Sequence, residues 1–289
     1  AYYRFDQGDT NTILSNEVVA ANDGTLTNMT GNEWASSLAF GADITAPTIS
    51  SVSSDKAAGS YKAGEVIDID VNFSESVTVS GTPQITLETG STDQVVNYSS
   101  GSGTSTLTFN YTVQAGDTSS DLDYTSTSAL ALNSGTIQDA SSNNAALTLA
   151  SPGASNSLGN SEALVIDTTA PTITITADEV SDGGTSNDST LSLIFTSSES
   201  STNFAVGDIS VSGGSLSIFS GSGSIYTATF TPSADGATTI DVAANGFTDA
   251  AGNNNTAATQ FNWTYDSSAP NTPIVSAITP TNNPMPTWS

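Results

Sequence analysis

Three short signals recur in the same order along the chain, and this internal repeat narrows the possible folds more than any other feature. They are a junction Asp followed by two residues and Ala-Pro, a strand-like segment that closes on a Glu, and an acidic turn Asp-Ala-x-x-Asn. Their acidic residues are Asp43, Glu75 and Asp139, then Asp167, Glu199 and Asp249, and lastly Asp266 at a third junction. In both complete copies 32 residues separate the junction Asp from the Glu. Such agreement indicates repeated structural units.

The spacing of the junctions sets the size of each unit. They lie 124 and 99 residues apart, which suits one β-sandwich of about 100 residues each. We therefore predict a first module at 43–166 and a second at 167–266. Residues 1–42 lie outside the repeat, and 267–289 read as the start of a further module.

Between the signals, apolar residues alternate with polar ones, the period expected of half-buried strands. Four such residues run from Ile67 to Phe73 and four more from Leu107 to Val113. The second module repeats the pattern at Leu191/Leu193/Phe195, Ile209/Val211, Leu216/Ile218, Ile240/Val242 and Phe261/Trp263/Tyr265. No stretch holds a helical period over three turns. The fold class predicted is all-β, as tandem immunoglobulin-like sandwiches.

The junctions themselves are short. Proline restricts the residue before it to extended geometry, so each Ala-Pro pair, such as Ala170-Pro171, stiffens the linker. We therefore expect the modules to be arranged end to end as a rod.

Positive side chains are almost missing. The chain has a net charge of −26 with 29 acids, and its only cations are Arg4, Lys56 and Lys62. Nucleic acid is disfavoured as a partner because phosphate binding needs Lys or Arg, and anionic membrane surfaces are disfavoured for the same reason. No apolar run approaches the roughly 20 residues of a membrane span, so membrane insertion is not expected.

Catalysis has few candidate groups in this sequence. The chain lacks His and Cys, which excludes a Ser-His-Asp triad, a thiol nucleophile and a His-ligated zinc site. A carboxylate pair remains conceivable, but no pair is singled out. We expect that the protein is not an enzyme.

Acids that have no protein cation beside them must be solvated or bind ions from solution. Asp43, Glu75 and Asp139 would meet at one end of the first sandwich, where loops cluster, with no lysine or arginine to neutralise them. Asp167, Glu199 and Asp249 would do the same in the second, and Asp266 begins a third such set. Hard oxygen ligands of this kind suit Ca²⁺. The alternative is that Asp139 and Asp249 only form Asx-turns and that Asp167 only caps a loop.

Two further acidic clusters are less specific. Asp117, Asp121 and Asp123 could form a local Ca²⁺ loop, although solvated turn residues are the preferred interpretation. Asp178, Glu179 and Asp182 open a Gly-rich loop, and both interpretations stand for them.

The repeat signals resemble the bacterial immunoglobulin-like repeats of very large secreted adhesins. Asp167-Thr-Thr-Ala-Pro-Thr172 carries the resemblance, and the stretch from Val113 to Tyr124 followed by Ala129-Leu-Ala-Leu-Asn133 is similar to one common subtype. The resemblance implies an extended stalk at the bacterial cell surface, often stiffened by Ca²⁺ at junctions and exported by type I or type IX secretion. Its partners would be neighbouring modules of the same long chain and a host, prey or substratum surface.

The start of the chain resembles something else. Ala1-Tyr-Tyr-Arg-Phe-Asp6 and Asp23-Gly-Thr-Leu-Thr-Asn28 are similar to fragments of laminin-G or concanavalin-like lectin modules, which implies glycan binding. Trp34 and Trp288 lie in incomplete segments, whereas Trp263 alternates with Phe261 and Tyr265 and is expected in the core.

Three functional hypotheses follow. The first is a stalk or adhesive fibre segment, a filament-forming part of an extracellular adhesin in which calcium rigidifies the junctions. The second is a carbohydrate-binding surface module that uses residues 1–42. The third is the subunit of a homo-oligomeric extracellular appendage.

Overall fold

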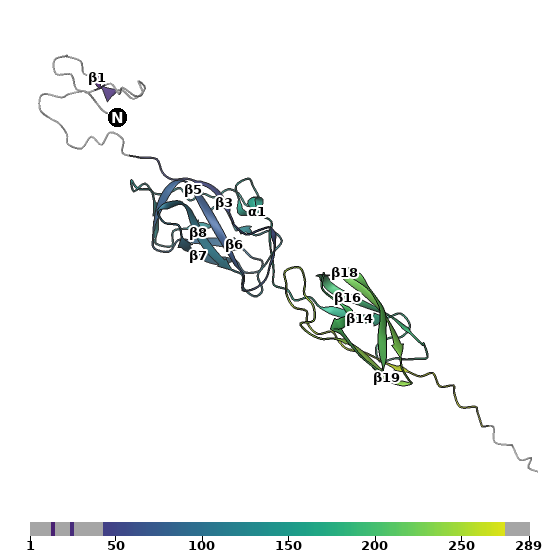
Figure 1. Ribbon diagram of the computed structural model, residues 1–289. Coiled ribbons are helices and arrows are strands. Elements are labelled where there is room, and N and C mark those ends of the chain that lie inside the picture. The colour runs from purple at the N-terminus through teal and green to yellow at the C-terminus, as the bar shows by residue number, and fades with distance from the viewer. Residues whose placement is uncertain (1–12, 15–23, 26–42, 275–289) are drawn as a thin grey trace, which may run out of the picture. The chain divides into compact units, whose positions relative to one another are not determined.

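In the computed structural model of the chain, the described residues are 13–14, 24–25 and 43–274. Residues 1–44 and 45–289 separate into two units. In the first unit β1 (Ile13–Leu14) pairs with β2 (Gly24–Thr25) in antiparallel fashion. Apart from Gly24 and Thr25, the lectin-like signals lie outside the described residues, as do Trp34 and Trp288. The second unit contains two β-sandwiches (Figure 1).

The first sandwich is built almost wholly of strands. They are β3 (Ile49–Ser53), β4 (Gly59–Tyr61), β5 (Val66–Ser80), β6 (Gln84–Glu88), β7 (Gln94–Ser100), β8 (Thr104–Thr112), β9 (Thr118–Ser119), β10 (Asp123–Tyr124), β11 (Leu130–Ala131), β12 (Thr136–Gln138) and β13 (Leu164–Asp167), with one short helix, α1 (Leu158–Ser161). β5 to β8, β10 and β12 form the main path of an eight-stranded sheet, with β3 and β11 attached to it. β4, β13 and β9 form a second sheet.

The second sandwich has two sheets. The first contains β14 (Ile173–Ala177), β16 (Leu191–Ser201) and β18 (Gly214–Pro232), in that order. The second contains β15 (Thr185–Ser186), β20 (Phe261–Tyr265), β19 (Gly236–Val242) and β17 (Ile209–Ser212), which follows the short 3₁₀ helix η2 (Val206–Asp208). The all-β prediction is confirmed.

Alternation placed the core residues of β5 and β16 correctly. Ile67, Ile69, Val71 and Phe73 of β5 are all at most 5% exposed, and they pack with β8 in one hydrophobic cluster. Leu191, Leu193 and Phe195 of β16 do the same in a separate cluster, which also holds Trp263 at 2% exposure. Each sandwich therefore has its own core, and the expectation that Trp263 belongs to it is confirmed.

One predicted strand face is wrong. Leu216 is half-buried, but Ile218 is 78% exposed and has a positive φ of 52°. A left-handed backbone at a β-branched residue breaks the alternation, so the side chain of Ile218 leaves the core face.

Candidate metal centres

The two repeat copies build the same hydrogen-bonded scaffold beside their acids. After the first Ala-Pro, the Thr48 amide donates to Ser74 Oγ (3.0 Å), and the Ser74 amide donates to the Thr48 carbonyl (2.8 Å). After the second, Thr172 and Ser198 exchange the same two bonds at 2.9 and 2.8 Å. Since each Ser directly precedes the Glu of its repeat, this clamp fixes the junction segment against the Glu-bearing strand.

The junction proline is tied to the acidic turn in both copies. The Pro47 carbonyl accepts from the Ala146 amide at 2.8 Å, and the Pro171 carbonyl accepts from the Thr256 amide at 3.0 Å. Each amide lies three residues after the Asn that ends the turn. Three segments far apart in sequence are thereby held together at one place in each sandwich.

The predicted end of the Glu-bearing strand is wrong, and the difference matters for the site. β5 continues past Glu75 to Ser80, and β16 continues past Glu199 to Ser201. In both strands the register shifts across the Glu, between Asn72 and Val77 and between Thr196 and Ser201. A bulge of this kind re-aims side chains and bends the strand, which turns the Glu toward the turn Asp.

The turn Asp is held rigidly by its own Asn. Asp249 Oδ1 accepts from the Asn253 amide at 2.9 Å, and Oδ2 accepts from Asn253 Nδ2 at 2.9 Å. Asp139 makes the matching bonds with Asn143 at 2.8 and 2.7 Å. Both Asp side chains are buried. The Asx-turn interpretation therefore holds. In each turn, Oδ2 of the Asp accepts one of these bonds, which leaves a lone pair on that oxygen for a further ligand.

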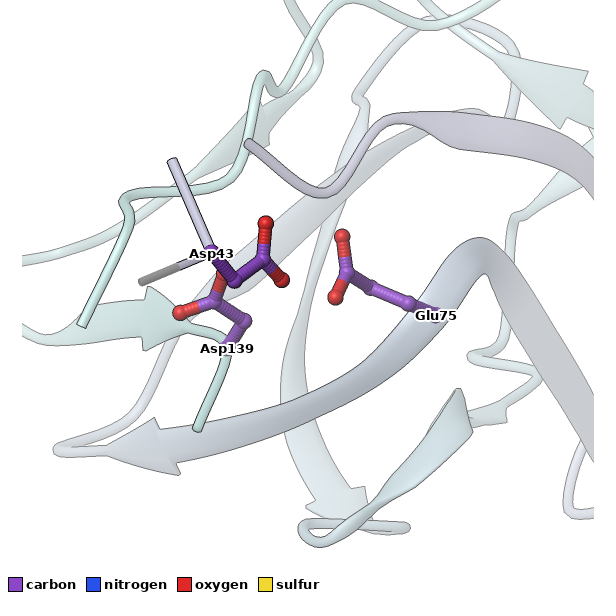
Figure 2. Close-up of side chains that lie close together, drawn as sticks. All are labelled: Asp43, Glu75 and Asp139. Carbon is purple, nitrogen blue, oxygen red and sulfur yellow. The ribbon is translucent and has the colours of Figure 1, made fainter. Parts of the chain in front are cut away.

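The carboxylates converge in both copies. Asp167, Glu199 and Asp249 each offer an oxygen, and these oxygens lie within 4.8 Å of one another. Asp43, Glu75 and Asp139 do the same, and Figure 2 shows the Glu75 carboxylate facing those of Asp43 and Asp139. Two like charges about 4 Å apart near a protein surface repel by about 4 kcal/mol. Such a triad favours a bound cation or a proton.

The neighbouring carboxylates affect the pKa of Glu199. Burial raises the pKa of its carboxyl group above the ordinary value, and the negative charges of Asp167 and Asp249 raise it further. Asp139 behaves in the opposite way. Burial would raise its pKa, but the hydrogen bonds from Asn143 and from the Ser141 and Ser142 amides outweigh that effect and lower it.

Two direct contacts also reach the Asp249 turn. Lys62 Nζ donates to the Gly252 carbonyl at 2.7 Å, and Asn253 Nδ2 donates to the Asp167 carbonyl at 2.9 Å. A lysine therefore lies beside this turn, where it contacts a backbone carbonyl. This contact joins two distant parts of the sequence, which spacing alone does not reveal.

The seventh predicted ligand, Asp266, belongs to none of the acidic groups found among the described residues. Its amide donates to the Ser186 carbonyl, and its Oδ1 accepts from the Ser268 amide at 3.0 Å. Most of the segment from residue 267 onward lies outside the described residues.

Sequence reasoning missed a third triad. Asp55, Asp68 and Asp70 bring oxygens within 4.8 Å of one another. The Asp55 amide donates to Asp68 Oδ2 at 2.7 Å, and burial raises the pKa of Asp70. Asp68 and Asp70 share one face of β5 because strand side chains alternate. This shared face was the sequence signal that could have predicted the triad.

The preferred interpretation of Asp117 and Asp123 as solvated is wrong. Asp117 is 4% exposed and accepts from Gln94 Nε2, from the Tyr111 hydroxyl and from the Gln114 amide. Asp123 is 8% exposed and accepts from the Tyr124 and Gly153 amides. These two acids are buried hydrogen-bond acceptors that fix loops.

The remaining cluster fixes its loop to β16 and β20. Glu179 accepts from the Ser192 amide and hydroxyl, and Asp182 Oδ1 accepts from the Asn262 amide at 2.7 Å. Together with Asp178, these acids belong to none of the acidic triads in the described part of the chain.

Comparison with known families agrees with this architecture. Residues 167–265 match the family model described as a bacterial Ig-like domain. No curated protein matches the chain. Domains of this family are typically non-enzymatic modules of surface-associated proteins, and residues 167–265 are similar to them. In the part of the chain that the structure describes, no helix has the length and apolar character needed to cross a membrane.

Proposed function

We propose that the chain is a stalk or adhesive fibre segment of a large secreted bacterial surface protein, and that Ca²⁺ rigidifies it. The single observation that supports calcium is the repeated scaffold, which brings three carboxylates within 4.8 Å in each copy. The match of the second module to bacterial Ig-like domains supports the structural role. Attachment to a host, prey or substratum surface, with or without glycans, belongs to the same proposal.

Calcium fits the donor set better than other common ions. It takes six to eight oxygen ligands at about 2.3–2.6 Å and tolerates irregular geometry. Asp167, Glu199 and Asp249 offer carboxylate oxygens only, without nitrogen or sulfur ligands, and water and backbone carbonyls would complete the shell. Because these three acids come from the end of β13, from β16 and from the 249–253 turn, one ion would cross-link three separate segments.

The test of this proposal is calorimetric titration of the full chain with CaCl₂ in metal-free buffer. We expect Glu199→Gln and Glu75→Gln each to reduce the number of ions bound by one per chain. Asp121→Asn removes an equal charge at an exposed position outside the triads and should leave the stoichiometry unchanged. Wild-type protein that binds no calcium would contradict the proposal, as would binding that neither Gln variant alters.

The raised pKa of Glu199 predicts a pH dependence of stability in the absence of metal. Between the ordinary value of 4.5 and the raised value, the native state holds more protons than the unfolded state. The free energy of unfolding should therefore fall as the pH rises through that window and level off above it. Urea unfolding in EDTA at a series of pH values measures this. Glu199→Gln should remove this contribution, and an identical slope in the variant would assign the effect to other groups.

A further inference from the structure

The main sheet of the first sandwich splits between two neighbouring strands. β7 pairs with β8 through Tyr98↔Phe109 and Ser100↔Thr108, with a register shift between them. Before that point, residues 94–97 of β7 pair with β6 only, and residues 110–112 of β8 pair with β5 only. A groove opens where the two strands diverge.

The direction of the backbone groups in the groove follows from the ladder bonds on either side. The Tyr98 amide donates to the Pro83 carbonyl of the β6 side at 2.8 Å. Since consecutive residues of a strand direct their N–H and C=O groups to opposite edges, Val96 also faces β6 and Val95 faces the groove. Thr86, which pairs with Val95, directs its own amide away from β7, to the Ala129 carbonyl. This bond confirms the assignment.

The opposite wall is partly capped. The Val113 amide donates to the Glu65 carbonyl, so Thr112 directs its backbone away from β5, into the groove. Its carbonyl accepts from Gln114 Nε2 at 2.7 Å. Among the described residues, no side chain caps the backbone of Val95 on the β7 wall in this way, and the Val95 side chain is 54% exposed. An uncapped, apolar edge of this kind is a template for strand pairing.

The groove has the size and chemistry of a peptide site. Its volume is about 400 Å³, and its walls carry only uncharged side chains: Gln94, Val95, Asn97, Asn110, Thr112 and Gln114 are among them. Acids lie beyond the β8 wall. Asp68 pairs with Asn110 across the β5–β8 ladder, so its side chain lies on the same outer face. Asp68 also belongs to the third acidic triad.

We propose that this groove binds an extended peptide strand of a partner, which adds to the Val95 edge of β7 and carries Lys or Arg on its outward face. Backbone bonds to Val95 would hold the strand, as in other cases of strand addition to a sheet edge. Its outward side chains would lie about two strand spacings, or ~10 Å, from Asp68, where an opposite charge is attracted. A second copy of this chain fits poorly, because its net charge of −26 repels.

The experiment measures binding of labelled, end-capped octapeptides to the full chain by fluorescence anisotropy. A peptide of alternating Val and Lys should bind, and one of alternating Val and Glu should bind at least about tenfold more weakly. Val95→Pro removes the groove-facing N–H without cutting the β6 ladder. It should weaken binding of the Val-Lys peptide by about tenfold, the effect of losing roughly one hydrogen bond. Val95→Thr keeps the backbone donor and should bind within about twofold of wild type.

A second measurement guards against a misfolded Pro variant. N-methylation of alternate residues removes the N–H donors from one edge of the Val-Lys peptide. Of the two such peptides, one methylated at its Val residues and one at its Lys residues, one should fail to bind the unaltered protein. Equal binding by both methylated peptides would overturn the proposal, as would equal affinity for the Val-Glu peptide. Self-association of the chain that Val95→Pro abolishes, without peptide binding, would assign the groove to a second copy and likewise overturn it.

Discussion

Glu199→Gln should reverse its effect on thermal stability when calcium is added. In EDTA the variant should melt at or above the temperature of the wild type, because one of three mutually repelling carboxylates is gone. In CaCl₂ at about 100 times the dissociation constant, each site stabilises the wild type by about 2.7 kcal/mol. This corresponds to a rise of about 5 °C or more for a unit of this size, and the variant should lose the contribution of its site. Differential scanning calorimetry in both buffers measures this reversal.

This reversal of the effect on melting temperature distinguishes ion binding from ordinary packing. Glu199 is half-buried on β16, and Gln has nearly the same shape. If Glu199 had a purely structural role, the substitution would change the melting temperature by the same amount in both buffers. Asp121→Asn should not show this reversal between the two buffers. MgCl₂ should raise the melting temperature less than CaCl₂, since Mg²⁺ is reluctant to give up its waters. Parallel melting curves for the wild type and Glu199→Gln in both buffers would contradict a calcium site at this triad.

Phe204→Ala should destabilise the second sandwich by about 3–5 kcal/mol. Phe204 is 5% exposed and lies in the loop between β16 and η2. Its ring meets four other aromatic rings at centroid distances of 5.0–5.9 Å, those of Phe195, Phe219, Tyr226 and Phe247. Truncation leaves a cavity at the centre of this cluster. Calorimetry should show a loss of about 12 °C or more in the melting of this sandwich.

The first sandwich should keep its own transition in this variant, because its core is a separate cluster. Val206→Ala is the matched control. Val206 lies two residues further along, at the start of η2, and is 47% exposed, so its truncation should change the free energy of unfolding by no more than about 0.5 kcal/mol. A Phe204→Ala protein that melts within a degree or two of the wild type would show that the ring does not organise the core.

The triads could be anticipated because the repeat made two independent copies visible. An equal spacing from Asp43 to Glu75 and from Asp167 to Glu199 marks residues that occupy equivalent places in a fold. The third triad has no repeated partner and was missed, although Asp68 and Asp70 share a strand face. Phe204 was missed for a similar reason, since a single aromatic residue in a polar loop carries no periodicity.

Local pattern in the sequence determined which segments become strands and which residues enter each core, as at Ile67, Ile69 and Val71. This works because alternation along a strand is a property of consecutive residues and survives any choice of strand partner.

Tertiary structure alone decided where strands bulge or part. It shifted the register of β5 and β16 across Glu75 and Glu199, brought Lys62 to Gly252, and opened the groove beside Val95. These features depend on pairings between distant segments, whose register is settled by packing the whole sandwich. A chain read residue by residue holds no local trace of them.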